Sequence, residues 1–208
     1  MIAVVDYGMG NLRSVSKALE KLGAEVSVTS DPENLRKADK VVLPGVGAFG
    51  DAVCELRKRN LIKPIKDSVE KGKPFLGVCL GLQLLFRSSE EDAKSPGLGI
   101  LEGKVIRFPK QDPQGASLKV PHMGWNEVRL QNKEQSTFLS QVKDASYFYF
   151  VHSYYAVPED RSVIHGVSEY GVSFPSIIGR RNVWATQFHP EKSQEEGLKI
   201  LANFVKMQ

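Results

Sequence analysis

The chain has 208 residues, of which 41% are hydrophobic and 25% charged, and its formal net charge is +4. This length and composition are typical of a soluble globular protein that buries its core without disulfides or a metal. The mild charge, with no lysine/arginine block and no nucleic-acid-binding motif, argues against nucleic acid as a partner. The longest apolar runs are too short to span a membrane.

The N-terminal residues predict a first strand over 2–5 and not an export signal. The apolar segment reaches Asp6 at once and lacks the basic residues that open a signal peptide. With no export signal and only two cysteines, Cys54 and Cys79, a reducing compartment is the default. We therefore expect a cytoplasmic protein.

The first half of the chain alternates between strand-like and helix-like segments. Apolar runs predict strands over 2–5, 25–29, 40–43 and 75–78. Apolar residues at helical spacing predict helices over 11–22, 49–60, 62–71 and 80–88. Because strands separated by helices imply right-handed crossovers, this half predicts an α/β fold with a doubly wound, mostly parallel sheet and flanking helices.

The second half contains mostly strands. They are predicted over 105–108, 125–130, 147–151, 163–167, 176–179 and 183–188, and we expect them to extend or flank the main sheet, partly antiparallel. A last helix is predicted over 193–207, with Ser193 as its N-cap. Because no repeat or long linker interrupts the chain, a single domain over 1–208 is expected.

A nucleophile is predicted at the junction of the fourth strand with the next helix, in Gly77-Val78-Cys79-Leu80-Gly81. A G-x-C-x-G turn is the cysteine version of a nucleophile elbow, whose small flanking residues permit a strained turn. The turn exposes the Cys79 sulfur at the carboxyl edge of the sheet and near a helix N-terminus, which favours a thiolate. The backbone N–H of Leu80 points toward a developing oxyanion. Cys54 lies mid-helix without glycines and is expected to be an ordinary structural cysteine.

The base is predicted at His189, in Phe188-His189-Pro190-Glu191. Because the proline favours an extended His189, the side chains of His189 and Glu191 project to the same side. Glu191 can then hold one imidazole nitrogen while the other faces the sulfur, as in a nucleophile–base–orienter triad. A parallel last strand would bring this segment to the edge that carries Cys79. The other histidines lack such a partner: His122, His152 and His165.

Two glycine pairs have less specific meanings. Gly8 and Gly10 follow the first strand as in a dinucleotide-binding loop, but Arg13 stands where the third glycine of that fingerprint belongs, so a tight turn is favoured. Gly45 and Gly47 fit either an ordinary turn before the next helix or an oxyanion-binding segment. No paired Cys/His spacing predicts a metal site, and none is expected.

Several segments carry a resemblance to a known family. GVCLGLQLL (77–85) and QFHPEKS (187–193) are similar to the class I, triad-type glutamine amidotransferases. Four further segments resemble one branch of that family, the amidotransferase subunits of imidazole glycerol phosphate synthase in histidine biosynthesis. These segments are DYGMGN (6–11), PGVG (44–47), PHMGWN (121–126) and FVHSY (150–154).

The resemblance covers nearly the whole chain and implies a flavodoxin-like fold and a glutaminase activity. It implies glutamine as substrate, no cofactor, and a heterodimer with a (β/α)₈ cyclase subunit that uses the ammonia to make imidazole glycerol phosphate and AICAR. Cys79 would attack the glutamine carboxamide, His189 would transfer the proton, and Glu191 would orient His189. Backbone N–H groups of Leu80 and of Val46 or Gly47 would form the oxyanion hole, each worth about 3 kcal/mol of barrier.

The resemblance also implies binding residues. Gln83 and Glu91 match positions that hold the amino-acid end of glutamine, and the backbone of His152, Ser153 and Tyr154 matches the segment that contacts its carboxylate. The positions that match the partner interface are Asn11, Met123, Trp125, Tyr149 and Lys192. From composition alone, Trp125 fits a buried core or a partner-facing anchor equally well.

Two other functions stay open. The chain could be a triad amidotransferase of another synthase, such as anthranilate synthase or a pyridoxal-phosphate synthase, although HMGWN and DYGMGN argue against this. It could also be a catalytically dead binding module, although the intact Cys79, His189 and Glu191 argue against that. Alkylation of Cys79 by a glutamine analogue separates the enzyme from the binding module.

Overall fold

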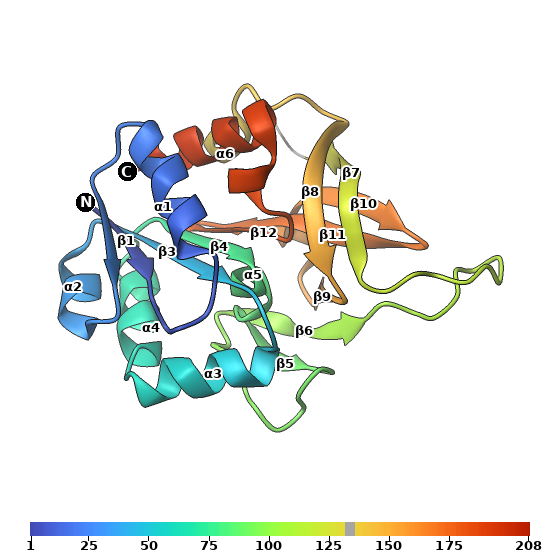
Figure 1. Ribbon diagram of the computed structural model, residues 1–208, viewed down its shortest axis with the longest axis horizontal. Coiled ribbons are helices and arrows are strands. Elements are labelled where there is room, and N and C mark those ends of the chain that lie inside the picture. Colours follow the sequence, from blue (N-terminus) through green and yellow to red (C-terminus); the bar gives the residue numbers. More distant parts are fainter. Residues whose placement is uncertain (132–135) are drawn as a thin grey trace.

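A computed structural model describes residues 1–131 and 136–208, and its main feature is a nine-stranded sheet in the order β2-β1-β3-β4-β12-β11-β10-β7-β8 (Figure 1). The first five strands in this order are mutually parallel. They are β2 (Val26–Thr29), β1 (Ile2–Val5), β3 (Lys40–Gly45), β4 (Phe75–Cys79) and β12 (Val183–Thr186). The predicted parallel sheet is confirmed, and the C-terminal strand β12 lies directly beside β4.

The remaining strands of the sheet are antiparallel, as expected for the second half of the chain. They are β11 (Val172–Arg180), β10 (Ile164–Tyr170), β7 (His122–Leu130) and β8 (Ser146–His152). A smaller three-stranded sheet contains β5 (Phe86–Ser89), β6 (Leu101–Arg107) and β9 (Tyr154–Pro158). Short 3₁₀ turns occur at η2 (Thr137–Leu139), η3 (Arg161–Val163) and η4 (Pro190–Lys192).

Helices cover both faces of the parallel strands. Helices α1 (Leu12–Lys21) and α6 (Gln194–Lys206) lie on one face, and α2 (Pro32–Lys37), α3 (Phe49–Lys58) and α4 (Ile62–Glu70) lie on the other (Figure 1). Because strand side chains alternate between faces, Ala3 and Val5 pack with the α3 side, whereas Ile2 and Val4 pack with the α1 side. Each face of β1 is thus buried in its own hydrophobic core, as a doubly wound sheet requires.

The predicted helix over 80–88 is wrong beyond its first turn. Helix α5 spans only Leu80–Gln83, and the chain then enters β5, where Phe86 pairs with Leu101 of β6. The apolar run after Cys79 fits either a helix or a buried strand, and pairing with β6 selects the strand. A one-turn helix carries a small dipole, so the expected stabilisation of the Cys79 thiolate by a helix N-terminus is weaker than predicted.

The predicted N-cap Ser193 does precede α6, but its side chain makes no capping hydrogen bond. Its Oγ instead donates to the His189 carbonyl at 2.6 Å and accepts from the Tyr149 N–H at 3.0 Å. The Tyr149 carbonyl in turn accepts from the His189 N–H at 2.9 Å. Ser193 and strand β8 therefore hold the segment that carries the predicted base.

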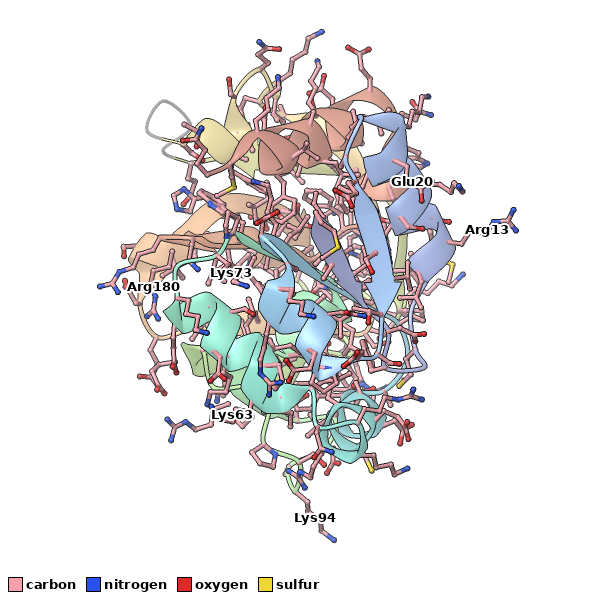
Figure 2. The ribbon with its side chains drawn as sticks, turned by 90° about the vertical axis from the view of Figure 1, so that its left-hand side faces the viewer. Arg13, Glu20, Lys63, Lys73, Lys94 and Arg180 are labelled. Carbon is pink, nitrogen blue, oxygen red and sulfur yellow. The ribbon has the colours of Figure 1, made fainter. Side chains whose placement is uncertain are left out.

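Charged side chains cover the outside of the molecule. In Figure 2, Arg13, Lys94 and Arg180 extend away from the ribbon, and all three are exposed. Within the described residues, no helix combines the length and the apolar character needed to cross a membrane.

Candidate active site

Cys79 lies at the carboxyl end of β4 in a strained backbone conformation. Its φ is 55° and its ψ is −108°, a combination that non-glycine residues rarely adopt. The turn depends on close approach of the backbone at Gly81, because a side chain there would collide with the Leu43 carbonyl oxygen. The predicted nucleophile elbow is therefore present in the backbone, and the side chain of Cys79 is 5% exposed.

His189 and Glu191 follow β12, the parallel neighbour of β4, in which Thr186 pairs with Val78. The carboxyl ends of these two strands therefore bring residue 189 to the same edge as Cys79. His189 Nδ1 and Glu191 Oε1 are 2.9 Å apart, and both side chains are almost fully buried. Since a carboxylate only accepts, Nδ1 carries the proton, which leaves Nε2 as the nitrogen available to a thiol.

The surroundings of His189 favour its protonated form. Burial lowers the pKa of the imidazole, but the neighbouring Cys79 and the hydrogen-bonded carboxylate of Glu191 outweigh it and raise the pKa to about 9. Because a neighbouring thiolate and carboxylate raise its pKa, the His189 imidazole is suited to accept a thiol proton and to hold it.

A cavity of about 380 Å³ opens in front of the sulfur. Its wall contains Cys79 and every residue predicted to form the oxyanion hole or to bind glutamine: Leu80, Val46, Gly47, Gln83, Glu91, His152, Ser153 and Tyr154. Val151 and Pro121 complete the lining. The structure thus brings together residues from segments that are far apart in the sequence, and the volume fits a small molecule.

Hydrogen bonds fix the two side chains predicted to hold the amino-acid end of glutamine. Gln83 Nε2 donates to the Tyr154 carbonyl at 2.9 Å and to Gln187 Oε1 at 3.1 Å. Because both protons of that amide are used, Gln83 offers its Oε1 as an acceptor for a ligand ammonium. Glu91 Oε2 accepts from the Phe49 N–H at 2.8 Å, at the start of α3.

The segment predicted to supply the second oxyanion donor is anchored at one end. The buried Tyr7 hydroxyl donates to the Pro44 carbonyl at 2.9 Å. At the other end, Gly47 has a φ of +97°, which disfavours any side chain, and it lies against the methyl end of Met9. Burial and the nearby Cys79 raise the pKa of Tyr7, so the phenol stays neutral and remains a donor.

The other histidines and the second cysteine lie away from the sulfur or serve different contacts. His122 and His152 form a buried pair, with His122 Nδ1 and His152 Nε2 2.9 Å apart. His165 lies on β10 beside Trp184, with ring centroids 4.8 Å apart. Cys54 is exposed on α3, so it does not fill a core position.

Two residues at the site were not predicted from the sequence. Gln187 is fully buried, and its Nε2 donates to Cys79 Sγ at 3.8 Å. The same i, i+2 alternation that relates His189 to Glu191 also relates Gln187 to His189, and it could have identified this residue. Tyr7 carried no such signal, because its contact with Pro44 depends on how the loop after β1 folds back on β3.

The residues predicted to form a partner interface gather around one exposed aromatic patch. Trp125 on β7 pairs with Tyr149 on β8, their rings are 6.1 Å apart, and Lys192 Nζ lies 5.7 Å from the Tyr149 ring centroid. Met123 is 62% exposed and Trp125 47%, so Trp125 is not a core residue. Asn11 caps α1, which contacts η4 beside this patch.

Comparison with known proteins agrees with this geometry. Residues 3–207 match the model of the family "Glutamine amidotransferase class-I". The curated imidazole glycerol phosphate synthase subunit HisH of Syntrophotalea carbinolica is 53% identical, over 98% of each chain. The same subunit of Bacillus subtilis is 49% identical, over 100% of this chain and 96% of that protein.

Solved structures support the fold. A crystal structure of a glutamine amidotransferase covers 100% of both chains, with a TM-score of 0.75 at 19% identity. The structure of PurLQS from Thermotoga maritima covers 98% of this chain and 96% of its own, with a TM-score of 0.74 at 20% identity. The chain therefore belongs to the class-I glutamine amidotransferases, in the branch of the imidazole glycerol phosphate synthase subunits HisH.

Proposed function

We propose that this protein is the glutaminase subunit of imidazole glycerol phosphate synthase, which hydrolyses glutamine and supplies ammonia for histidine biosynthesis. The identity of about half of all residues to curated subunits of that name, over nearly the whole chain, supports this function. The observation that carries the proposal for the site is the placement of Cys79, His189 and Glu191 at one sheet edge, behind a cavity of about 380 Å³.

The chemistry begins with transfer of the Cys79 proton to His189 Nε2. The thiolate attacks the carboxamide carbon of glutamine, and the C–N bond breaks as His189 returns the proton to the departing nitrogen, which leaves as ammonia. Water then attacks the resulting thioester, with His189 as the base, and releases glutamate and the thiol. Glu191, hydrogen-bonded to Nδ1, would leave Nε2 free to exchange a proton with the sulfur and would stabilise the imidazolium.

Binding and stabilisation come from the cavity wall. The Gln83 acceptor oxygen and the Glu91 carboxylate would hold the substrate ammonium, and the backbone of residues 152–154 would hold its carboxylate. The N–H of Leu80 and an N–H of Val46 or Gly47 would receive the oxyanion. Loss of one such donor typically lowers the rate by about a hundred- to thousand-fold.

We further propose that the patch of Met123, Trp125, Tyr149 and Lys192, with Asn11, docks the (β/α)₈ cyclase subunit as a heterodimer. Met123 and Trp125 are exposed and Tyr149 is half-buried beside them, and tryptophan, methionine and tyrosine side chains are typical of interface cores. Through its backbone, Tyr149 also bonds His189 and Ser193, so the docking surface lies directly over the catalytic segment.

Two more general features belong to the same proposal. The chain acts as one catalytic domain, because residues from both halves of the sequence line the same cavity. It works in the cytoplasm, because a nucleophilic thiol must stay reduced.

The function is tested by glutamate release from the complex with a cyclase subunit, for the wild type and for Cys79→Ala. Cys79→Ala removes only a sulfur from a nearly buried turn, so folding and partner binding are expected to persist while glutamate release is lost. Cys54→Ala is the matched control, and it should keep full activity because Cys54 is exposed on α3. Turnover retained in Cys79→Ala would refute the triad.

A further inference from the structure

A continuous chain of hydrogen bonds runs through the interior from β7 to the glutamine cavity. Asn126 Nδ2 and His122 Nε2 are 3.3 Å apart, and His122 Nδ1 and His152 Nε2 are 2.9 Å apart. His152 Nδ1 lies 2.8 Å from the Tyr154 carbonyl. A carbonyl can only accept, so Nδ1 of His152 carries the proton, its Nε2 accepts from His122, and His122 Nε2 accepts from Asn126.

Both histidines must be neutral for this chain to exist, and their burial favours that state. Burial lowers the pKa of His122 to about 4 and that of His152 to about 3. At neutral pH each ring therefore carries one proton, and every link has one donor and one acceptor. The direction of the chain is fixed from Asn126 to the Tyr154 carbonyl.

A second series of hydrogen bonds links the Tyr154 carbonyl to Cys79. Gln83 donates to the Tyr154 carbonyl and to Gln187 Oε1, and Gln187 Nε2 lies 3.8 Å from Cys79 Sγ. If the Gln187 amide were turned over, two buried N–H₂ groups would face each other and one donor would lose its acceptor. Gln83 therefore holds the amide of Gln187 with its donor toward the sulfur.

We propose that Gln187 is a further residue of the reaction machinery, which holds the Cys79 sulfur as a hydrogen-bond donor and favours its thiolate form. This inference rests on the proposed function, since it assigns a part in the same reaction. An amide can donate to the sulfur but cannot take its proton, so Gln187 does not compete with His189 as the base. With α5 reduced to one turn, such a donor supplies part of the stabilisation that a longer helix would give.

Of the other groups that face the sulfur, some favour the thiolate form of Cys79 and others favour the thiol. His189 carries the positive charge that favours the thiolate, with Glu191 behind it. The Val151 carbonyl lies 3.9 Å from Sγ, where it accepts from the thiol and opposes the thiolate. The neutral Tyr7 phenol lies near enough for Cys79 to raise its pKa. Gln187 thus opposes Val151 directly, and its loss should shift the balance toward the thiol.

The test is a pH titration of the Cys79 thiolate in a Cys54→Ser background, followed by ultraviolet absorbance and by the rate of iodoacetamide alkylation. Gln187→Met keeps the length of the side chain and removes the donor. We expect its thiolate midpoint to rise by about one pH unit, a tenfold change in the equilibrium. In the complex with the cyclase subunit, kcat for glutamine should fall about tenfold while KM stays within about twofold.

Two further variants make the result specific. Thr186→Val loses a buried side-chain hydrogen bond on the same segment, in which the hydroxyl donates to the Phe188 carbonyl and not to the Cys79 sulfur. Its midpoint should equal that of the parent. Gln187→Glu replaces the donor by an acceptor of nearly the same shape, so its midpoint should rise further than in Gln187→Met. If Gln187→Met does not fold, the thiolate midpoint of Gln187→Glu alone tests the role of the donor.

A midpoint in Gln187→Met or Gln187→Glu equal to that of the parent would overturn the inference, and so would an equal shift in Thr186→Val. The titration needs neither glutamine nor the cyclase subunit. An inactive wild-type complex would therefore count against the proposed function without affecting the titration, and an unshifted titration would leave glutaminase activity intact.

Discussion

His189 and Glu191 differ in what their removal takes from the site. In the proposed reaction, His189→Ala removes the base that would take the thiol proton and return it to ammonia, whereas Glu191→Gln leaves the base and weakens only its orientation at Nδ1. We therefore expect a larger loss of kcat in His189→Ala than in Glu191→Gln, and a loss of at least about tenfold in the latter.

The measurement is steady-state glutamate release from the complex with the cyclase subunit, with the double variant as control. Because the two residues act as a unit, the double variant should be no worse than His189→Ala alone. A kcat for Glu191→Gln within about twofold of the wild type, under about 0.5 kcal/mol of barrier, contradicts the orienting role.

The raised pKa of His189 predicts an alkaline limit to turnover. The imidazolium persists up to a pH of about 9, and above it the ring has no proton to give to the departing nitrogen. Activity should therefore fall as the pH rises through about 9. Because Glu191 helps to raise this pKa, the alkaline limb should move to lower pH in Glu191→Gln. The measurement is kcat against pH in the complex. If kcat fell at the same pH in the wild type and in Glu191→Gln, the alkaline fall would not be due to His189.

At the scale of elements, the loop after β1 anchors the end of β3 through a single hydroxyl. Tyr7→Phe removes the donor to the Pro44 carbonyl and leaves that buried carbonyl unsatisfied. We expect a loss of stability of about 1–3 kcal/mol. We also expect kcat of the complex to fall about tenfold with little change in KM, because the oxyanion segment loses its anchor. Chemical denaturation and glutaminase kinetics measure the two effects.

Tyr170→Phe is the matched control for this variant. It also removes a tyrosine hydroxyl bonded to a backbone carbonyl, that of Lys119 at 2.6 Å, but far from β3. Its kcat should stay at the wild-type value. Equal losses of kcat in both variants would mean that Tyr7 contributes only general stability.

The elements that the sequence predicts well are those with a clear period or cap. Strand β1, helix α1 and the parallel arrangement of the strands in the first half follow from such patterns. Helix α2 was missed because its six residues bury only Leu35, although Asp31 and Pro32 are good start signals. Strand β9 was missed because only Ser153 separates it from β8, so one apolar run enters two sheets.

The site followed the same rule. The elbow and the triad are local patterns, and strand pairing then brings them together. The i, i+2 alternation of strand side chains would have been enough to identify Gln187. The Tyr7–Pro44 hydrogen bond and the pairing of His122 with His152 depend instead on tertiary contacts between segments that no local pattern relates.

At the scale of the whole molecule, the neutral pair His122 and His152 predicts an acid-sensitive fold. Both pKa values are lowered by burial, to about 4 and about 3, so the unfolded chain binds more protons between those values and about 6.5. Stability is then lost as the pH falls through this window, by up to about 1.4 kcal/mol per pH unit for each histidine. His189, with a raised pKa, loses nothing in this range.

Thermal unfolding between pH 7 and pH 4 measures this effect, since the window is set by the pKa values just given. The wild type should lose stability steadily on acidification. His122→Gln carries no titrating ring, so its stability should fall less steeply. Parallel curves for the two proteins would show that the pair does not control the acid limit.

Partner docking is the other whole-molecule prediction. The backbone of Tyr149 joins the exposed patch to His189, and Gly47 lets the oxyanion segment change its orientation at low steric cost. We expect the isolated chain to be a poor glutaminase, activated by the cyclase subunit and most strongly when that subunit holds its nucleotide substrate. One restored oxyanion donor suffices for about a hundredfold increase. Equal kcat/KM for the isolated chain, for the complex and for the complex with the nucleotide substrate would contradict activation by the partner.

The position of β12 between β4 and β11 also determines the order in which the site is made during synthesis. Cys79 leaves the ribosome early, whereas β12, His189 and Glu191 lie at the far end of the chain. At translation rates of about 5–20 residues per second, the thiol waits roughly ten seconds for its base. A nascent chain therefore carries Cys79 without its proposed base, and we expect glutaminase activity only once the last strand has inserted beside β4.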